Sequence, residues 1–138
     1  MALKFYPRAG EMFMCNLSEF KAPEMDKVRP VIVISPRLPY RSEIVTLVPI
    51  SLTPPRHDLP FCYRLSKNYN PNEPDDLPCW AKCDMLLNLC RDRLTCFKIG
   101  RRKYYNPRLT EVDFEGVRRG VLHGLGMGSL ISLPAEAI

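Results

Sequence analysis

The run 31-VIVI-34 places four β-branched residues in succession, which is typical of a strand buried on both faces. Pro30 stands directly before it, and proline in a sheet is confined to the first position of a strand, an edge or a bulge. Arg29 is therefore expected where a loop enters the sheet. Side chains at such junctions stand on a rigid base and commonly carry function, although a plain surface arginine is the simpler interpretation of this stretch alone.

Further apolar segments, each bounded by turn residues, predict a sheet of short strands. We expect strands over 12–17, 30–35, 43–51, 60–66 and 79–87. One helix is expected over 111–125, because Thr110 and Asp113 form a capping-box pattern ahead of apolar residues at helical spacing. Short strands followed by one helix predict an α+β, mainly β fold, with a small antiparallel barrel that is closed or nearly closed.

The expected helix carries glycines at every fourth position. These are Gly116, Gly120, Gly124 and Gly128. Each glycine weakens an isolated helix by about 1 kcal/mol, so the stripe needs a packing reason. We expect it to let the helix approach the sheet or a second helix closely.

The bulk properties indicate one domain over residues 1–138, since 138 residues with 46% hydrophobic content suit a single moderate core. The segment 67-KNYNPNEPDDLP-78 is a loop by composition, and loops of this length are usually functional or mobile. The tail 129–138 carries no signal. No apolar run approaches the roughly 18 residues that span a bilayer, and no signal-peptide pattern opens the chain. We therefore expect a cytoplasmic protein without a membrane partner.

Six cysteines raise the question of disulfides or zinc. A cytoplasmic location disfavours disulfides, and zinc sites favour CxxC pairs, whereas Cys79 and Cys83 are four apart and Cys90 and Cys96 follow at loose spacing. The two histidines lie far apart in the sequence. We expect reduced structural thiols, no metal and no cofactor.

The charge pattern favours an anionic partner, because the net charge is +5 and the isoelectric point is about 9.0. The stretch 91–108 concentrates seven basic residues against Asp92 alone, which is compatible with a solvated face. Tyr104 and Tyr105 follow its basic triplet and add aromatic surface on which bases can stack. The stretch therefore leans toward single-stranded nucleic acid.

Four polar side chains at strand ends could carry chemistry. Arg29 precedes one expected strand, Ser51 closes another, and Lys82 and Asp84 flank Cys83 on a later one. On a strand Lys82 and Asp84 would share a face, either as a salt bridge or as an acid–base pair around a phosphate. Arginine, hydroxyl, lysine and carboxylate together suit phosphodiester cleavage by an internal nucleophile, which in RNA is the ribose 2′-OH.

The order of these segments resembles the MazF/PemK/Kid family, the toxins of type II toxin–antitoxin pairs. The likeness begins in 10-GEMFMCNLS-18 and continues through 24-EMDKVRPVIVIS-35, 45-VTLVPIS-51 and 82-KCDMLLNLCRDRL-94. It implies an SH3-like barrel with a C-terminal helix, a homodimer, and a metal-independent ribonuclease for single-stranded RNA. Cleavage would leave a 2′,3′-cyclic phosphate and a 5′-hydroxyl, and the toxin would be paired with a small acidic antitoxin.

The resemblance also implies roles for individual residues. Arg29 falls on the family's catalytic arginine, Ser51 on its threonine, Asp84 on a general base and Lys82 on the basic partner of that base. Substrate-binding positions are expected at Glu24, Lys27, Arg56, Arg91 and Arg93.

Some positions depart from the family's pattern. Pro23 stands where a histidine is found, and Met85, Leu87 and Asn88 replace frequent Gln, Arg and Thr. A different class of function is therefore weighed beside the enzyme: a CcdB-like or degenerate binding module that grips a protein or an RNA without cutting it. The joint presence of Arg29, Ser51 and Asp84 favours the enzyme, and the altered 85–88 segment favours the binding module.

Overall fold

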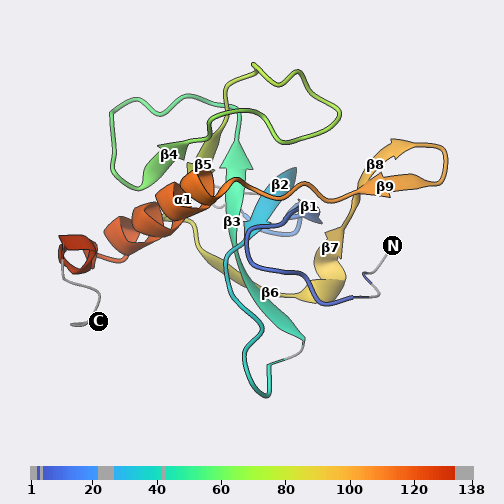
Figure 1. Cartoon of the computed structure of the whole chain (residues 1–138), viewed down its shortest axis with the longest axis horizontal. Helices are drawn as coiled ribbons and strands as arrows, with labels where there is room; N and C mark the ends of the chain where they lie inside the picture. Colours follow the sequence, from blue (N-terminus) through green and yellow to red (C-terminus); the bar gives the residue numbers. More distant parts are fainter. Residues whose placement is uncertain (1–2, 4, 22–26, 42, 133–138) are drawn as a thin grey trace.

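The computed structural model describes residues 3, 5–21, 27–41 and 43–132 (Figure 1). Its strands are β1 Met12–Asn16, β2 Val28–Val33, β3 Ile44–Ser51, β4 Cys62–Arg64, β5 Trp80–Lys82, β6 Leu87–Cys90, β7 Leu94–Thr95, β8 Phe97–Gly100 and β9 Lys103–Tyr105. The helix α1 spans Glu111–Gly124, and two short 3-10 turns, η1 Arg91–Arg93 and η2 Gly128–Ser132, complete the described elements.

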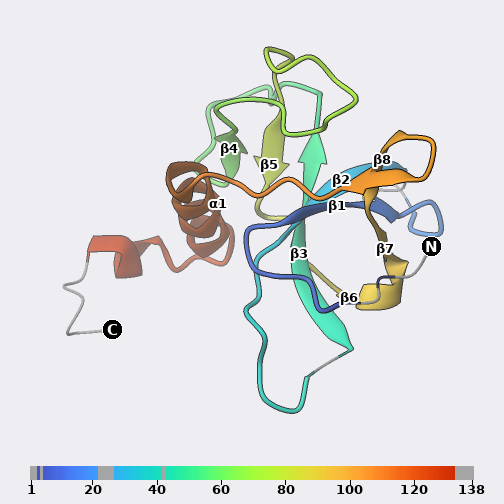
Figure 2. The ribbon, with the colours of Figure 1, turned by 45° about the vertical axis from the view of Figure 1, so that its right-hand side comes forward.

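The main sheet runs β4-β5-β3-β2-β1-β7, with β6 also pairing β3, and β8 and β9 form a separate hairpin. The pairings are antiparallel, so the predicted mainly β fold with one C-terminal helix is confirmed. Figure 2 shows β1, β3, β6 and β7 arranged as a ring. No ladder among the described residues joins β6 to β7, and the turn η1 links them in the chain instead. Closure of the barrel by hydrogen bonds is thus not found.

The prediction of one strand over 79–87 is wrong, because β5 and β6 are separated by a turn. β5 pairs with Ile50 and Ser51 at the end of β3, whereas β6 pairs with the first half of β3, from Ile44 to Leu47. Pro49 lies between these two ladders and has no N–H to donate to a neighbouring strand. The chain therefore stops pairing with β3 at the end of β5 and turns away after Lys82. In that turn the Met85 N–H donates to the Lys82 carbonyl at 3.0 Å.

The two faces of the sheet bury separate apolar clusters. Residues such as Met12, Ile32 and Val48 face α1 and pack with Val117 and Val121 of that helix. The alternate residues, including Phe13, Val31, Val33, Leu47 and Leu94, fill the space enclosed by the ring of strands. Both clusters follow from the period of two along a strand, which sends successive side chains to opposite faces.

Helix α1 begins at the predicted cap and packs through the predicted glycine stripe. The Thr110 hydroxyl accepts a hydrogen bond from the Asp113 N–H at 3.2 Å. A Cβ atom on Gly116 would overlap the Tyr63 ring, and one on Gly120 would lie 2.6 Å from Cys83 Sγ. The stripe therefore brings the helix against β4 and the end of β5, and the expected close approach to the sheet is confirmed.

Asp113 ties the start of α1 to the chain that follows β4. Its carboxylate is fully buried and accepts hydrogen bonds from the Tyr63 hydroxyl at 2.8 Å, the Ser66 hydroxyl at 2.5 Å and the Tyr69 hydroxyl at 2.6 Å. Burial raises the pKa of Asp113, but the hydrogen bonds from Ser66, Tyr69 and Tyr63 outweigh burial and hold it below its usual value. Burial, with the bond to Asp113, raises the pKa of Tyr63 to about 12.

We predict that Gly116→Ala destabilises the protein, although alanine favours an isolated helix. The added methyl group would collide with the Tyr63 ring, and overpacking of this kind costs about 1–3 kcal/mol. Urea denaturation measures the free energy of unfolding, and Val112→Ala on the exposed side of α1 is the control. An unchanged or higher midpoint for Gly116→Ala would contradict the close packing.

We also predict that acid destabilises the fold through Asp113. Because the pKa of this carboxyl is lower in the folded than in the unfolded protein, its contribution is complete above the unfolded value of about 3.9 and is lost as the pH falls through the folded value. Asp113→Asn should lower the free energy of unfolding at pH 7 and flatten its fall below about pH 4. Asp58→Asn, at an exposed site, should change neither, and an equally steep fall in Asp113→Asn would refute the assignment.

Candidate functional site

Arg29 and Ser51 lie on adjacent strands, on the sheet face that points away from α1. Val31 of β2 pairs with Pro49 of β3 as the last pair of that ladder, and Arg29 and Ser51 each lie two residues beyond it on these neighbouring strands. Arg29 is also the partner of Cys15 in β1. Two candidates from different parts of the sequence therefore lie at the same end of the β2–β3 ladder.

The Arg29 side chain is half-buried, and its charge is not compensated by any ion pair among the described residues. Its Nε atom is buried and has no hydrogen-bond partner in that part of the chain. Leaving a buried donor unsatisfied costs about 1–3 kcal/mol, and more when the group is charged. A guanidinium in this condition is suited to an anionic ligand, which its planar fork can bind through two oxygens.

Ser51 is buried at the end of β3, and the backbone two residues later orients its hydroxyl. Its Oγ accepts a hydrogen bond from the Thr53 N–H at 3.1 Å. Because that oxygen accepts one bond, the hydroxyl proton is available to donate to an oxygen atom of a ligand beside Arg29.

Lys82 lies on the same face as Ser51, whereas Asp84 has left the sheet. Lys82 pairs with Cys62 of β4, and its Nζ lies 3.4 Å from Cys62 Sγ. Asp84 is exposed in the turn after β5, and a Cβ on Gly124 would come within 3.1 Å of the Asp84 Cα, so this turn borders the end of α1. The alternation expected to place Lys82 and Asp84 on one face of a single strand does not apply, because the strand ends at Lys82.

The predicted substrate-binding residues are spread over three places. Lys27 is exposed directly before β2, and Arg56 is exposed in the connection between β3 and β4. Arg91 and Arg93 lie on η1 beyond the end of β6, and Glu24 lies outside the described residues.

Each arginine of η1 lies near an acid. Arg91 Nε lies 4.0 Å from a carboxylate oxygen of Glu43, which is too far for a hydrogen bond, and the Nε has no hydrogen-bond partner among the described residues. Arg93 is paired with Glu19 and stacks 5.9 Å from the centre of the Phe20 ring. Both pairs are partly exposed, so they are weak enough for an RNA phosphate to compete with them.

The first half of the loop 67–78 is held at two points. Tyr69 is buried and donates to Asp113, and the Asn72 side-chain amide donates to the Lys98 carbonyl of β8 at 3.0 Å. Asn70 and Glu73 of this loop, together with Arg29, line a cavity of about 250 Å³. Arg29 thus lies beside the loop as well as at the end of the β2–β3 ladder.

The hairpin β8–β9 projects away from the main sheet (Figure 1). It presents exposed side chains of Lys98, Arg101, Arg102, Lys103, Tyr104 and Tyr105. The basic and aromatic stretch noted in the sequence is therefore a solvent-facing arm of the molecule.

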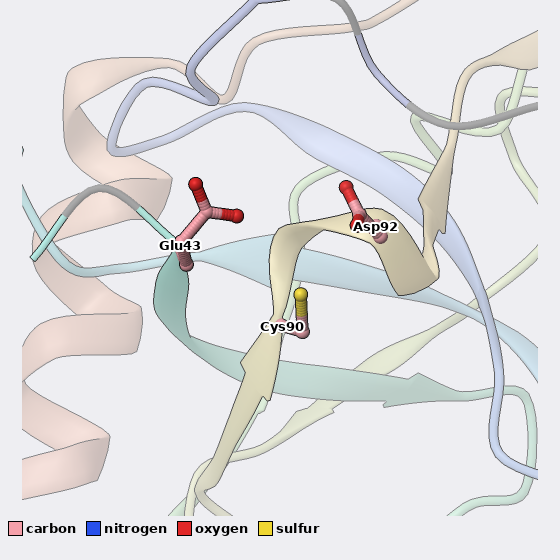
Figure 3. A group of neighbouring side chains, drawn as sticks. All are labelled: Glu43, Cys90 and Asp92. Atoms are coloured by element: carbon pink, nitrogen blue, oxygen red, sulfur yellow. The ribbon is translucent and has the colours of Figure 1, made fainter.

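A group of three potential metal ligands lies at the start of β3, with atoms within 4.8 Å of one another (Figure 3). These are Glu43, Cys90 and Asp92. Arg91 Nε, 4.0 Å from Glu43, already brings a positive charge to the group. We therefore interpret these side chains as part of a surface ion pair, and the expectation of metal-independent function stays a prediction.

All six cysteines are free thiols in the structure. Burial raises the pKa of Cys15 and Cys79 to about 11 and that of Cys83 to about 12. These three thiols are core residues with little thiolate at neutral pH, as expected from the sequence.

No helix in the described part of the chain is long and apolar enough to cross a membrane.

Solved structures with the same arrangement of strands and helix share little sequence with this chain. MazF (Form-I) from Deinococcus radiodurans is 20% identical with a TM-score of 0.65, covering 90% of this chain and 100% of its own. An endoribonuclease from Mycobacterial species is 16% identical with a TM-score of 0.62, covering 94% and 97%. An endoribonuclease in complex with its cognate antitoxin, also from Mycobacterial species, is 16% identical with a TM-score of 0.60, covering 88% and 96%.

These likenesses define the fold as MazF-like. The family profile described as PemK-like, MazF-like toxin of type II toxin-antitoxin system matches residues 8–122, and the chain belongs to that family. A comparison with curated proteins finds no match.

Proposed function

We propose that this protein is the toxin of a type II toxin–antitoxin pair and cuts single-stranded RNA without a metal ion, using the ribose 2′-OH as nucleophile. The observation that carries the proposal is the position of Arg29 and Ser51 at the same end of the β2–β3 ladder, where Arg29 supplies an uncompensated guanidinium and Ser51 an oriented hydroxyl. Lys82 adds a cation to the same face. Membership of the toxin family supplies the biological setting.

The reaction we infer balances as an internal transfer. Asp84 takes the proton of the 2′-OH, the 2′-oxygen bonds to phosphorus, and the bond from phosphorus to the 5′-oxygen breaks. The Lys82 ammonium gives a proton to the departing 5′-oxygen, which leaves a 2′,3′-cyclic phosphate and a 5′-hydroxyl. The turn that carries Asp84 follows directly from Lys82, so base and acid approach the scissile group from one end of β5.

Arg29 and Ser51 stabilise the negative charge that develops on the phosphate. The guanidinium binds two non-bridging oxygens and the Ser51 hydroxyl donates to one of them. Because both groups stand on adjacent strands of the central sheet, little reorganisation is needed when the charge forms. The positive surface along which the RNA backbone would run is extended by Lys27, Arg56, Arg91 and Arg93.

We further propose an acidic antitoxin and a homodimer as the assembly partners. The net charge of +5 and the exposed basic hairpin favour an acidic segment, and the Mycobacterial relative crystallised with its cognate antitoxin supports such a pairing.

The first prediction is that Arg29→Ala keeps the fold and abolishes growth inhibition on induced expression. Loss of one group that stabilises transition-state charge commonly costs on the order of 10²–10³ in rate. Arg118→Ala, on the exposed side of α1, is the matched control and should stay toxic. A folded, expressed Arg29→Ala that is fully toxic would reduce Arg29 to a surface residue at a strand end.

The second prediction concerns the nucleophile. The wild-type protein should cut single-stranded RNA in EDTA, and should fail when the nucleotide on the 5′ side of the scissile phosphate carries 2′-deoxyribose, because the attacking oxygen is then missing. Binding of the substituted strand should persist, since the phosphates and bases are unchanged. Asp84→Asn and Lys82→Ala should each lower cleavage more than binding.

Two outcomes would separate this mechanism from its rivals. Cleavage of the deoxy-substituted strand at the same bond would eliminate 2′-OH attack. RNA binding without cleavage across a broad panel of transcripts would instead identify a binding module that has lost its activity.

A further inference from the structure

Trp80 is the single tryptophan of the chain, and it lies outside both hydrophobic clusters. It stands at the start of β5 and is only half-buried, whereas its neighbours Cys79 and Ala81 turn to the other face and join the cluster against α1. A tryptophan is the largest apolar side chain a core can use. Its position away from the described core therefore needs a reason other than stability.

The strand register places Trp80 in the row that contains the proposed site. Ser51 of β3 pairs with Trp80, and Trp80 in turn pairs with Arg64 of β4. Since directly paired residues point to the same face, Ser51, Trp80 and Arg64 form one row, and Arg29 lies on the next strand, two residues beyond the last pair of the β2–β3 ladder. Adjacent strands are about 4.8 Å apart, so Trp80 stands about one strand spacing from Ser51.

The surroundings of Trp80 are cationic. The Arg64 guanidinium carbon lies 6.0 Å from the centre of the indole ring, and Arg64 is exposed. Lys82 follows two residues later on the same face of β5. An aromatic ring with Arg64 beside it and Lys82 on the same face of the strand matches a ligand that combines flat bases with phosphates.

We propose that Trp80 is a stacking platform for a nucleobase of single-stranded RNA, next to the nucleotide whose phosphate is held by Arg29 and Ser51. Arg64 fixes the orientation of the ring and binds a neighbouring phosphate. This inference rests on the proposed function, because it assigns a further subsite to the same strand of RNA. Stacking accepts every base, so Trp80 would contribute affinity and position, and base identity would be read by other groups.

The single tryptophan makes the proposal directly measurable. The probe is an RNA oligonucleotide centred on a mapped wild-type cleavage site, with 2′-deoxyribose at the reacting position so that it binds and is not cut. A pool of single-stranded RNA of random sequence serves as a second probe that needs no cleavage. Wild-type tryptophan fluorescence should change on binding of either probe, to saturation, while anisotropy of labelled RNA reports binding independently.

Substitutions then separate stacking from charge. Trp80→Ala should weaken RNA binding by about 5- to 100-fold, and Trp80→Phe should recover most of it, because a smaller ring still stacks. Arg64→Ala should weaken binding and lower the slope of log affinity against log salt by roughly 0.7, the value for one single-strand phosphate contact. Tyr40→Ala and Arg118→Ala are the controls, since Tyr40 is a fully exposed aromatic and Arg118 also stacks on a ring, that of Phe114.

The outcomes distinguish this proposal from the proposed function. If the wild type cleaves RNA, but Trp80→Ala binds as tightly as the wild type and fluorescence stays constant while anisotropy rises, the platform is wrong and the nuclease stands. If fluorescence changes and Trp80→Ala loses affinity while no RNA is cut, the platform stands and the nuclease is wrong. Should Trp80→Ala not fold, the wild-type fluorescence and the affinity of Trp80→Phe decide the matter.

Discussion

The buried carboxylate of Asp113 is the interaction on which the arrangement of the other parts depends. It accepts hydrogen bonds from Tyr63 on β4, from Ser66 just beyond that strand, and from Tyr69 in the loop 67–78. A single residue in the first turn of α1 thereby holds helix, strand and loop in one position. Because β4 pairs with β5, the same contacts support the strand that carries Trp80 and Lys82. A buried carboxylate is costly unless hydrogen bonds satisfy it. These three donors therefore favour a single arrangement of helix, strand and loop.

The sheet divides its two faces between stability and the proposed chemistry. One face is closed by α1, whose glycines allow helix and strands to approach until Gly120 meets Cys83. On the other face, β1, β2, β3, β6 and β7 form a ring, and β3, β5 and β4 extend beyond it (Figure 2). The ring encloses apolar side chains, and Ser51, Lys82 and Arg64 lie on the strands beyond it. Arg29 and Ser51 stand at the border between these two regions. The apolar interior makes the sheet rigid, and the adjoining region of β3, β5 and β4 gives access to solvent and ligand.

Pro49 is one residue that determines how β5 and β6 pair with β3. It separates the two ladders on the same side of β3, and the chain between them turns outward with Asp84. A continuous strand would have directed Lys82 and Asp84 to one face at a fixed spacing of two residues. The turn instead places Asp84 outside the sheet, beside the end of α1. Its position therefore depends on the helix as well as on the sheet. The spacing of Asp84 and Lys82, the base and the cation proposed above, is therefore a tertiary property.

The sequence by itself determined the features that depend on neighbours along the chain. The buried strand after Pro30, the cap at Thr110, the glycine stripe and the core thiols all follow from local pattern. Arg29 and Ser51 were proposed as site residues because Arg29 precedes an apolar run and Ser51 closes one. Only the tertiary structure decided which strands pair. Pro49 lies inside the strand expected over 43–51, and its effect on pairing became evident only once β5 and β6 were seen to share β3. Trp80 and Arg64 gave no signal at all, because their place beside Ser51 arises from cross-strand register, and register is set by long-range packing rather than by the residues on either side.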